Sequence, residues 1–125
     1  MFLAIRRVVV KLQDIIDKCS NLNIYEHRCM NDDFCELVFY NRDKKEWDRI
    51  LIDILGMARK PDGVTPTEDD LNLTKATGGI RINQTLFEKE FNNGTIIAKF
   101  WPWDDNTHIT LKMKMLPVGF QSEQD

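Results

Sequence analysis

The 125-residue sequence has little of what marks membrane-spanning or secreted chains. Cysteine, proline and glycine are sparse, at three, four and six residues. No apolar run reaches the roughly 18 residues that span a bilayer, because Arg6, Arg7 and Lys11 interrupt the apolar start. That start does not lead into the small residues of a signal-peptide cleavage site. We therefore expect neither a membrane span nor a signal peptide.

An excess of charge of one sign is also missing. The chain has 20 acidic and 17 basic residues spread along its length, for a net charge of −3. Binding to a phosphate backbone requires a basic stripe, so direct binding of nucleic acid is not expected. An odd number of cysteines without a secretory signal is typical of a reducing compartment, which predicts a cytoplasmic protein. Three Asn-x-Thr stretches fit the glycosylation pattern, which matters only in a translocated chain.

The sequence does contain enough apolar material for one core. It is 42% hydrophobic and 30% charged, and a chain of this size buries roughly two-thirds of the surface that its unfolded form exposes. We expect a single domain over residues 1–118, followed by a frayed polar tail over residues 119–125.

Two segments have the periodicity of amphipathic helices. In residues 5–22 apolar side chains recur every three or four positions, and they do so again in the segment that begins at Lys44. Asp43 as N-cap with Glu46 three residues later resembles a capping box. Proline restricts the residue before it, so the second helix should end before Pro61.

Residues 24–30 and 34–40 are runs of aromatic and aliphatic residues joined by the turn sequence Asn31-Asp32-Asp33, which predicts a β-hairpin. Pairing Met30 with Phe34 would place opposite each other Cys29 and Cys35, Arg28 and Glu36, and Tyr25 and Phe39.

The last third of the chain predicts further strands. Residues 85–91 and 95–101 flank Asn92-Asn93-Gly94, a sequence suited to a hairpin turn, although Leu86–Phe91 also fits a short helix. Residues 109–115 alternate clearly between apolar and polar, and a further short strand is predicted at residues 80–82.

Residues 61–79 are polar and show neither a helical nor a strand period. We predict a long loop, and loops of this length are usually functional or disordered. The order of elements predicts an α+β fold. Its architecture should be a two-layer sandwich, in which an antiparallel sheet of about five strands packs with two amphipathic helices.

One cluster has the residue types of a zinc site, namely Cys19, His27, Cys29 and Cys35. Three thiolates and one imidazole form a known closed set of zinc ligands, and the predicted register places His27, Cys29 and Cys35 on one face. Buried free cysteine is the stronger expectation, because cysteine behaves as a small hydrophobe. No cofactor is therefore predicted, and this cluster carries only an alternative hypothesis.

The stretch FWPWDDNTH, residues 100–108, carries the main candidate site. On a strand, Phe100 and Trp101 must point to opposite faces, and Pro102 cannot donate to a sheet ladder. Either another element covers Trp101, or the tryptophans form an exposed recognition spot, because tryptophan is enriched among interface anchors. The candidate partner-binding residues are Trp101, Trp103, Asp104 and Asp105.

These patterns favour a small non-catalytic protein-binding domain that binds a partner protein or a second copy of itself. Immunity proteins, secretion chaperones and phage accessory factors share its size and class, and nothing more specific. The negative net charge favours a basic partner. The alternative is a metal-dependent or cysteine-dependent factor built on the Cys19, His27, Cys29 and Cys35 cluster.

Overall fold

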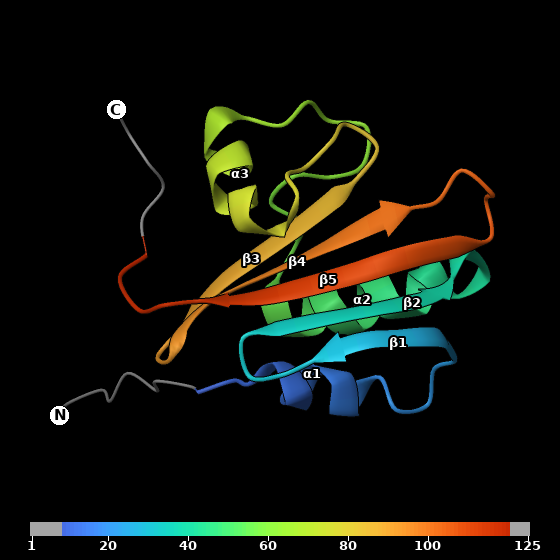
Figure 1. Cartoon of the computed structure of the whole chain (residues 1–125), viewed down its shortest axis with the longest axis horizontal. Coiled ribbons are helices and arrows are strands. Elements are labelled where there is room, and N and C mark those ends of the chain that lie inside the picture. The colour runs from blue at the N-terminus through green and yellow to red at the C-terminus, as the bar shows by residue number, and fades with distance from the viewer. Residues whose placement is uncertain (1–8, 121–125) are drawn as a thin grey trace, which may run out of the picture.

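The structure, a computed structural model, describes residues 9–120. Its centre is a five-stranded antiparallel sheet with the strand order β1-β2-β5-β4-β3 (Figure 1). The strands are β1 (Ile24–Met30), β2 (Phe34–Tyr40), β3 (Thr85–Phe91), β4 (Gly94–Pro102) and β5 (His108–Leu116). The predicted α+β sandwich with an antiparallel sheet is confirmed.

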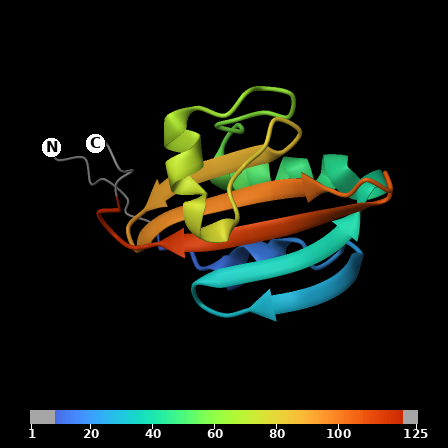
Figure 2. The same cartoon turned by 45° about the horizontal axis from the view of Figure 1, so that its top comes forward.

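Helices lie on both faces of the sheet. The helices α1 (Leu12–Lys18) and α2 (Lys44–Leu55) pack on one face, here called the inner face. The short helix α3 (Glu68–Leu73) lies on the opposite, outer face, in front of β3 and β4 (Figure 2). No helix within residues 9–120 is long and apolar enough to cross a membrane.

The main core fills the space between the inner face and the two larger helices. Trp47 of α2 stacks on Phe39 of β2, with ring centroids 4.6 Å apart, and Phe100 of β4 meets Phe39 edge-on at 5.3 Å. All three side chains are fully buried, and burying each such ring stabilises the fold by about 1.5–3 kcal/mol. The other buried members of this core are Leu12, Ile15, Cys19, Cys35, Leu37, Leu51, Leu55, Phe87, Ile96, Ala98, Ile109, Leu111 and Met113.

A second, smaller core lies on the outer face beneath α3. It consists of Leu73, Ile80, Leu86, Ile97 and Leu116. Because β3 and β4 carry apolar side chains on both faces, they need a cover on each side. The segment between α2 and β3 supplies the outer cover.

Two predictions about helix ends are wrong. The first helix begins at Leu12, whereas residues 9–11 are not helical and residues 1–8 lie outside the described part of the chain. The second helix begins at Lys44 as predicted, but Asp43 makes no capping hydrogen bond. Residues 41–43 form a 3-10 turn that places the Asp43 carboxylate 3.8 Å from the Arg42 Nε atom instead. The helix ends at Leu55 because Gly56 adopts a φ of 85°.

The extents of β1 and β2 are as predicted, and the predicted register holds at Glu26 and His27 in the middle of β1, but it is wrong by one residue at both ends of that strand. Met30 pairs with Cys35, and Cys29 pairs with Glu36, with two bulges along β1. The Asn31 side chain accepts hydrogen bonds from the backbone N–H groups of Asp33 and Phe34, at 2.9 Å each. This arrangement forms a wider turn than the predicted one. Cys35 therefore points into the core, while Cys29 is exposed.

The β3–β4 hairpin is confirmed, and Leu86–Phe91 is strand rather than helix. Gly94 is required at the first position of β4, because a Cβ atom there would lie 2.4 Å from the Leu116 carbonyl oxygen. Residues 80–82 form no strand. Ile80 is buried in the second core, and Lys60 instead makes the isolated bridge to Leu86 at the β3 edge.

Residues 61–79 are not the unstructured loop that their composition predicted. They contain α3 and a 3-10 turn over Lys75–Thr77. The helix begins with a capping box, in which Thr67 Oγ1 accepts from the Asp70 N–H at 3.1 Å and the Asp70 carboxylate accepts from the Thr67 N–H at 2.9 Å.

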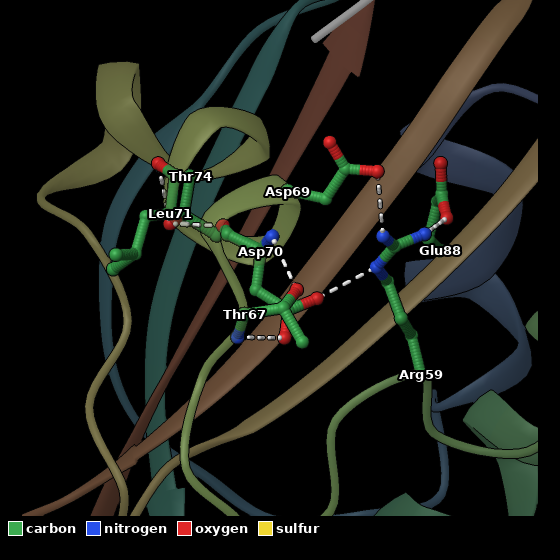
Figure 3. Close-up of polar contacts among 7 residues, drawn as sticks. All are labelled: Arg59, Thr67, Asp69, Asp70, Leu71, Thr74 and Glu88. Atoms are coloured by element: carbon green, nitrogen blue, oxygen red, sulfur yellow. Dashed lines mark hydrogen bonds and ion pairs between the residues drawn. The ribbon is translucent and has the colours of Figure 1, made fainter. Parts of the chain in front are cut away.

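Arg59 fixes α3 against β3. Its guanidinium donates to Asp70 and to Glu88 of β3 at 2.7 Å each, and to Asp69 at 3.4 Å (Figure 3). Burial alone would raise the pKa of Asp70, but hydrogen bonds from Thr67 and Arg59 outweigh it and hold that pKa below its ordinary value. Each donor in this network already has a carboxylate, so the network is structural.

Two buried lysines hold the rest of the segment. The Lys60 ammonium donates to the carbonyls of Pro61, Ile82 and Gln84 at 2.5–2.9 Å. The Lys99 ammonium, on β4, donates to the carbonyls of Thr77 and Gly79. Both side chains are about 1% exposed. Each lysine thus joins backbone carbonyls from different parts of the segment through one buried ammonium group.

We predict that Asp70→Asn lowers the free energy of unfolding at pH 7 by about 2 kcal/mol, because it removes the charge that faces Arg59 inside the fold. Asp69→Asn, at a half-exposed carboxylate, should change it by about 0.5 kcal/mol or less. Because the pKa of Asp70 is lower in the folded chain, its ionised carboxylate stabilises the fold at pH values above the ordinary aspartate pKa of 3.8. The difference between wild type and Asp70→Asn should shrink as the pH falls through the lower folded-state pKa. Urea titrations at pH 7 and pH 3 measure both effects, and equal costs for the two variants would contradict the prediction.

A second prediction concerns alkaline pH. Burial, followed by repulsion from Lys112, lowers the pKa of Lys99 from 10.5 to about 8. Between these values the unfolded chain holds a proton that the folded chain has lost, so stability should rise with pH. We expect a gain of about 1 kcal/mol from pH 8 to pH 9.

The control for this prediction is Lys99→Met, which should lack the rise. Burial raises the pKa of Cys19 and Cys35 to about 11, so these thiols destabilise the fold above pH 9.0, the ordinary thiol pKa. The comparison therefore ends at pH 9. Guanidinium titrations of both proteins at pH 7, 8 and 9 measure the effect. Parallel pH profiles would show that Lys99 stays charged in the fold.

Candidate interaction surface on the outer face of the sheet

The outer face is covered over only part of its width. The segment from Lys60 to Gln84 covers β3 and β4, whereas no helix among residues 9–120 lies over the outer side of β1 and β2 (Figure 2). Four aromatic side chains gather on this open part, and we call them the aromatic cluster. They are Tyr25 of β1, Tyr40 of β2, Trp103 and His108 of β5.

His108 lies at the centre of the aromatic cluster. Its ring centroid is 4.2 Å from that of Tyr25, 4.8 Å from that of Trp103 and 5.7 Å from that of Tyr40. Tyr25 meets both Tyr40 and Trp103 edge-on, at 75° and 89°. Edge-on aromatic pairs stabilise by about 0.5–1.5 kcal/mol each beyond their burial. The cluster is therefore a packed unit rather than a set of separate rings.

Hydrogen bonds in the β4–β5 turn fix two members of the cluster. The Trp103 N–H donates to the His108 carbonyl at 2.9 Å, and Trp103 Nε1 donates to Thr110 Oγ1 at 2.8 Å. Asp105 accepts from the N–H groups of Thr107 and His108 and lies 2.6 Å from His108 Nδ1. The bond with His108 is the main reason that the pKa of Asp105 is held below its ordinary value.

Two arginines flank the aromatic cluster. Arg28 lies over the Trp103 ring at 5.5 Å and also pairs with Glu36 at 3.2 Å and Glu26 at 3.4 Å. Arg42 lies over the Tyr40 ring at 4.4 Å. Tyr25 keeps 48% of its surface exposed. The Tyr25 ring is thus the most accessible member of the cluster, and the two arginine side chains lie beside the Trp103 and Tyr40 rings.

Trp101 occupies a different environment on the same face. Three cationic groups surround its ring, and we call them the cationic cluster: Lys112 at 4.8 Å, Lys99 at 5.4 Å and Arg81 at 5.8 Å from the ring centroid. Gly78 lies against them with a φ of 95°. A Cβ atom on Gly78 would be 3.7 Å from Lys112 Nζ and 3.8 Å from Trp101. The Trp101 ring is therefore half-buried beside this turn.

Of the four residues predicted to bind a partner, the structure brings the two tryptophans together on the outer face and places the two aspartates in the β4–β5 turn. Phe100 enters the inner core, while Trp101 and Trp103 both lie on the outer face, each half-buried. Trp101 pairs with Thr110, the residue that also receives the Trp103 hydrogen bond, so the two tryptophans are neighbours. Asp104 is exposed at the turn. Asp105 organises the turn itself.

Sequence reasoning missed Tyr25, Tyr40 and His108 as members of this surface. An aromatic partner for Tyr25 was predicted, but Tyr25 falls at the first bulge of β1, and its ring meets Tyr40 rather than Phe39. His108 is the first residue of β5, and the parity that it shares with Thr110 and Lys112 was the available signal for its face.

The predicted cysteine–histidine cluster does not assemble. Cys19 and Cys35 are buried in the inner core, while Cys29 and His27 are exposed. Burial raises the pKa of Cys19 and Cys35 to about 11, so both remain protonated thiols near neutral pH. Among residues 9–120 no group of three or more His, Cys, Asp or Glu side chains is placed to hold a metal ion.

Comparison of the chain with protein-family models, with curated proteins and with solved structures found no match.

Proposed function

We propose that the chain is a small non-catalytic domain that binds another protein, and that the aromatic cluster is the centre of its binding surface. The observation that carries this proposal is the position of four packed aromatic side chains on the part of the sheet that no described helix covers. We further propose that the protein acts in the cytoplasm, on the basis of its odd number of cysteines.

The composition of the surface supports binding. Tyrosine, tryptophan and arginine dominate the hot spots of protein interfaces, and here Tyr25, Trp103 and Arg28 lie in contact. Hydrogen bonds already fix Trp103 and His108. Little side-chain entropy is then lost when a partner packs against them.

A catalytic reading of His108 has less support. The pairing of His108 Nδ1 with Asp105 resembles the base and orienting acid of a hydrolytic triad. The imidazole, however, packs among three aromatic rings. Among the described residues, no hydroxyl or thiol nucleophile makes a hydrogen bond to it. The same Asp105 carboxylate also caps two backbone N–H groups of the turn, which is sufficient reason for its position.

The first test is affinity capture with wild-type protein, followed by identification of the retained protein and calorimetry with its purified form. We expect Tyr25→Ser to weaken that affinity at least about tenfold, because hot-spot truncations cost more than 1 kcal/mol. Tyr25 is exposed and is not a member of the inner core, so the fold should persist, and circular dichroism checks this.

The matched control is Met57→Ser, since Met57 follows α2 and is 77% exposed. This variant should bind like the wild type. The proposal fails if Tyr25→Ser and Trp103→Ala both retain full affinity, or if the Met57 variant loses as much as they do. Sedimentation of the same proteins shows whether the partner is a second copy of the chain.

A further inference from the structure

We propose that the cationic cluster around Trp101 receives carboxylates, so that the segment bound at the aromatic cluster is an acidic stretch of a partner protein. This inference rests on the proposed function and specifies the chemistry of the partner. It reverses the expectation of a basic partner, which the net charge of −3 suggests.

The cationic cluster has no counter-charge of its own. Arg81, Lys99 and Lys112 take no part in the ion pairs that residues 9–120 form. Glu36 lies opposite Lys112 in the β2–β5 register and acts on Lys99 at longer range, but its carboxylate is already paired with Arg28 at 3.2 Å. In a chain with more acids than bases, three unpaired cations at one place form a distinct positive site.

These cations also repel one another. Lys99 Nζ and Lys112 Nζ lie 3.9 Å and 3.7 Å from the same point, the position that a Cβ atom on Gly78 would take. Both ammonium groups donate to the Thr77 carbonyl, at 2.6 Å and 3.5 Å. An added carboxylate would relieve this repulsion, and guanidinium and ammonium groups are the side chains that bind carboxylates most strongly.

A ligand can reach part of this site. Lys99 is buried, but Lys112 is half-buried and Arg81 is exposed. Trp101 and Trp103 are two residues apart, and Thr110 lies between their side chains. Positions i and i+2 of an extended chain are about 6.5–7 Å apart on one face. An extended partner segment could therefore place an acidic side chain at Arg81 and Lys112, and an apolar one at the aromatic cluster.

The ring contacts favour a protein ligand over single-stranded nucleic acid. Binding of bases needs free aromatic faces on which they stack. Here three cationic groups surround Trp101, and Arg28 lies over Trp103 while His108 packs against it. A carboxylate needs only the cations at the rim of these rings.

Two labelled peptides test the inference by fluorescence anisotropy. The first repeats Glu-Ser-Tyr-Ser twice, which places glutamate and tyrosine on one face of an extended chain, and the second replaces each glutamate by lysine. We expect the acidic peptide to bind and the basic peptide not to bind. Affinity for the acidic peptide should fall as salt is added. An eight-residue oligothymidylate serves as the nucleic-acid probe.

Variants locate the binding. The double substitution Arg81→Glu with Lys112→Glu should weaken binding of the acidic peptide at least about tenfold, because it replaces two hydrogen-bonding cations with groups that repel a carboxylate. Arg81→Gln alone should weaken it less, and it keeps the inference testable if the double variant unfolds. Lys45→Glu, at an exposed position of α2, should bind like the wild type.

Several results would overturn the inference. These are no binding of the acidic peptide, equal binding of the basic peptide, tighter binding of the oligonucleotide, or a dimer of the chain that the double variant dissociates. If the acidic peptide fails while Tyr25→Ser still releases the captured protein, the acidic chemistry is wrong and the proposed function stands. If the peptide binds but the Tyr25 variant retains the captured protein, the cationic cluster acts without the aromatic cluster.

Discussion

The hydrogen bonds from the Lys99 ammonium to the carbonyls of Thr77 and Gly79 determine how the outer face is used. Lys99 lies on β4, an interior strand next to the edge strand β3, where an uncovered apolar neighbour such as Ile97 would otherwise meet water. By binding the turn before β3, together with Lys60 and Arg59, it holds a cover over one part of the sheet. This cover does not extend over β1 and β2, and the aromatic cluster lies on that open part of the outer face.

The two faces of the sheet are stabilised by different interactions. The inner face supplies most of the apolar burial through the stacking of Trp47 on Phe39 and its neighbours. The outer face is held by charged side chains that bind backbone carbonyls or carboxylates, such as Lys60 and Arg59. Polar anchoring fixes geometry but adds less net stability than apolar packing. Substitutions on the outer face can thus change binding while the inner core maintains the fold.

The sequence predicted the fold class and the strand extents because these depend on local signals. Alternation in β5 and the helical period after Lys44 are such signals. The β1–β2 register was wrong next to the turn because the Asn31 side chain widens that turn, which only the geometry of the folded turn reveals. The helix α3 was missed because its apolar residues are too few to show a period, although Thr67 and Asp70 have the spacing of a capping box. The two tryptophans were identified from sequence, whereas Tyr25 meets Trp103 only because β1, β2 and β5 pair side by side in the sheet.

The bulges of β1 have a consequence for how any partner would be selected. The strand is one edge of the sheet, and its two register shifts leave no long run of regularly spaced backbone groups along that edge. The other edge, β3, is partly occupied by the bridge from Lys60. Adding a foreign strand at an edge depends on backbone pairing and accepts many sequences. An edge that hinders strand addition favours contact through side chains, so that discrimination between partners depends on their amino-acid sequence. The same irregular edge also hinders edge-to-edge aggregation of the molecules.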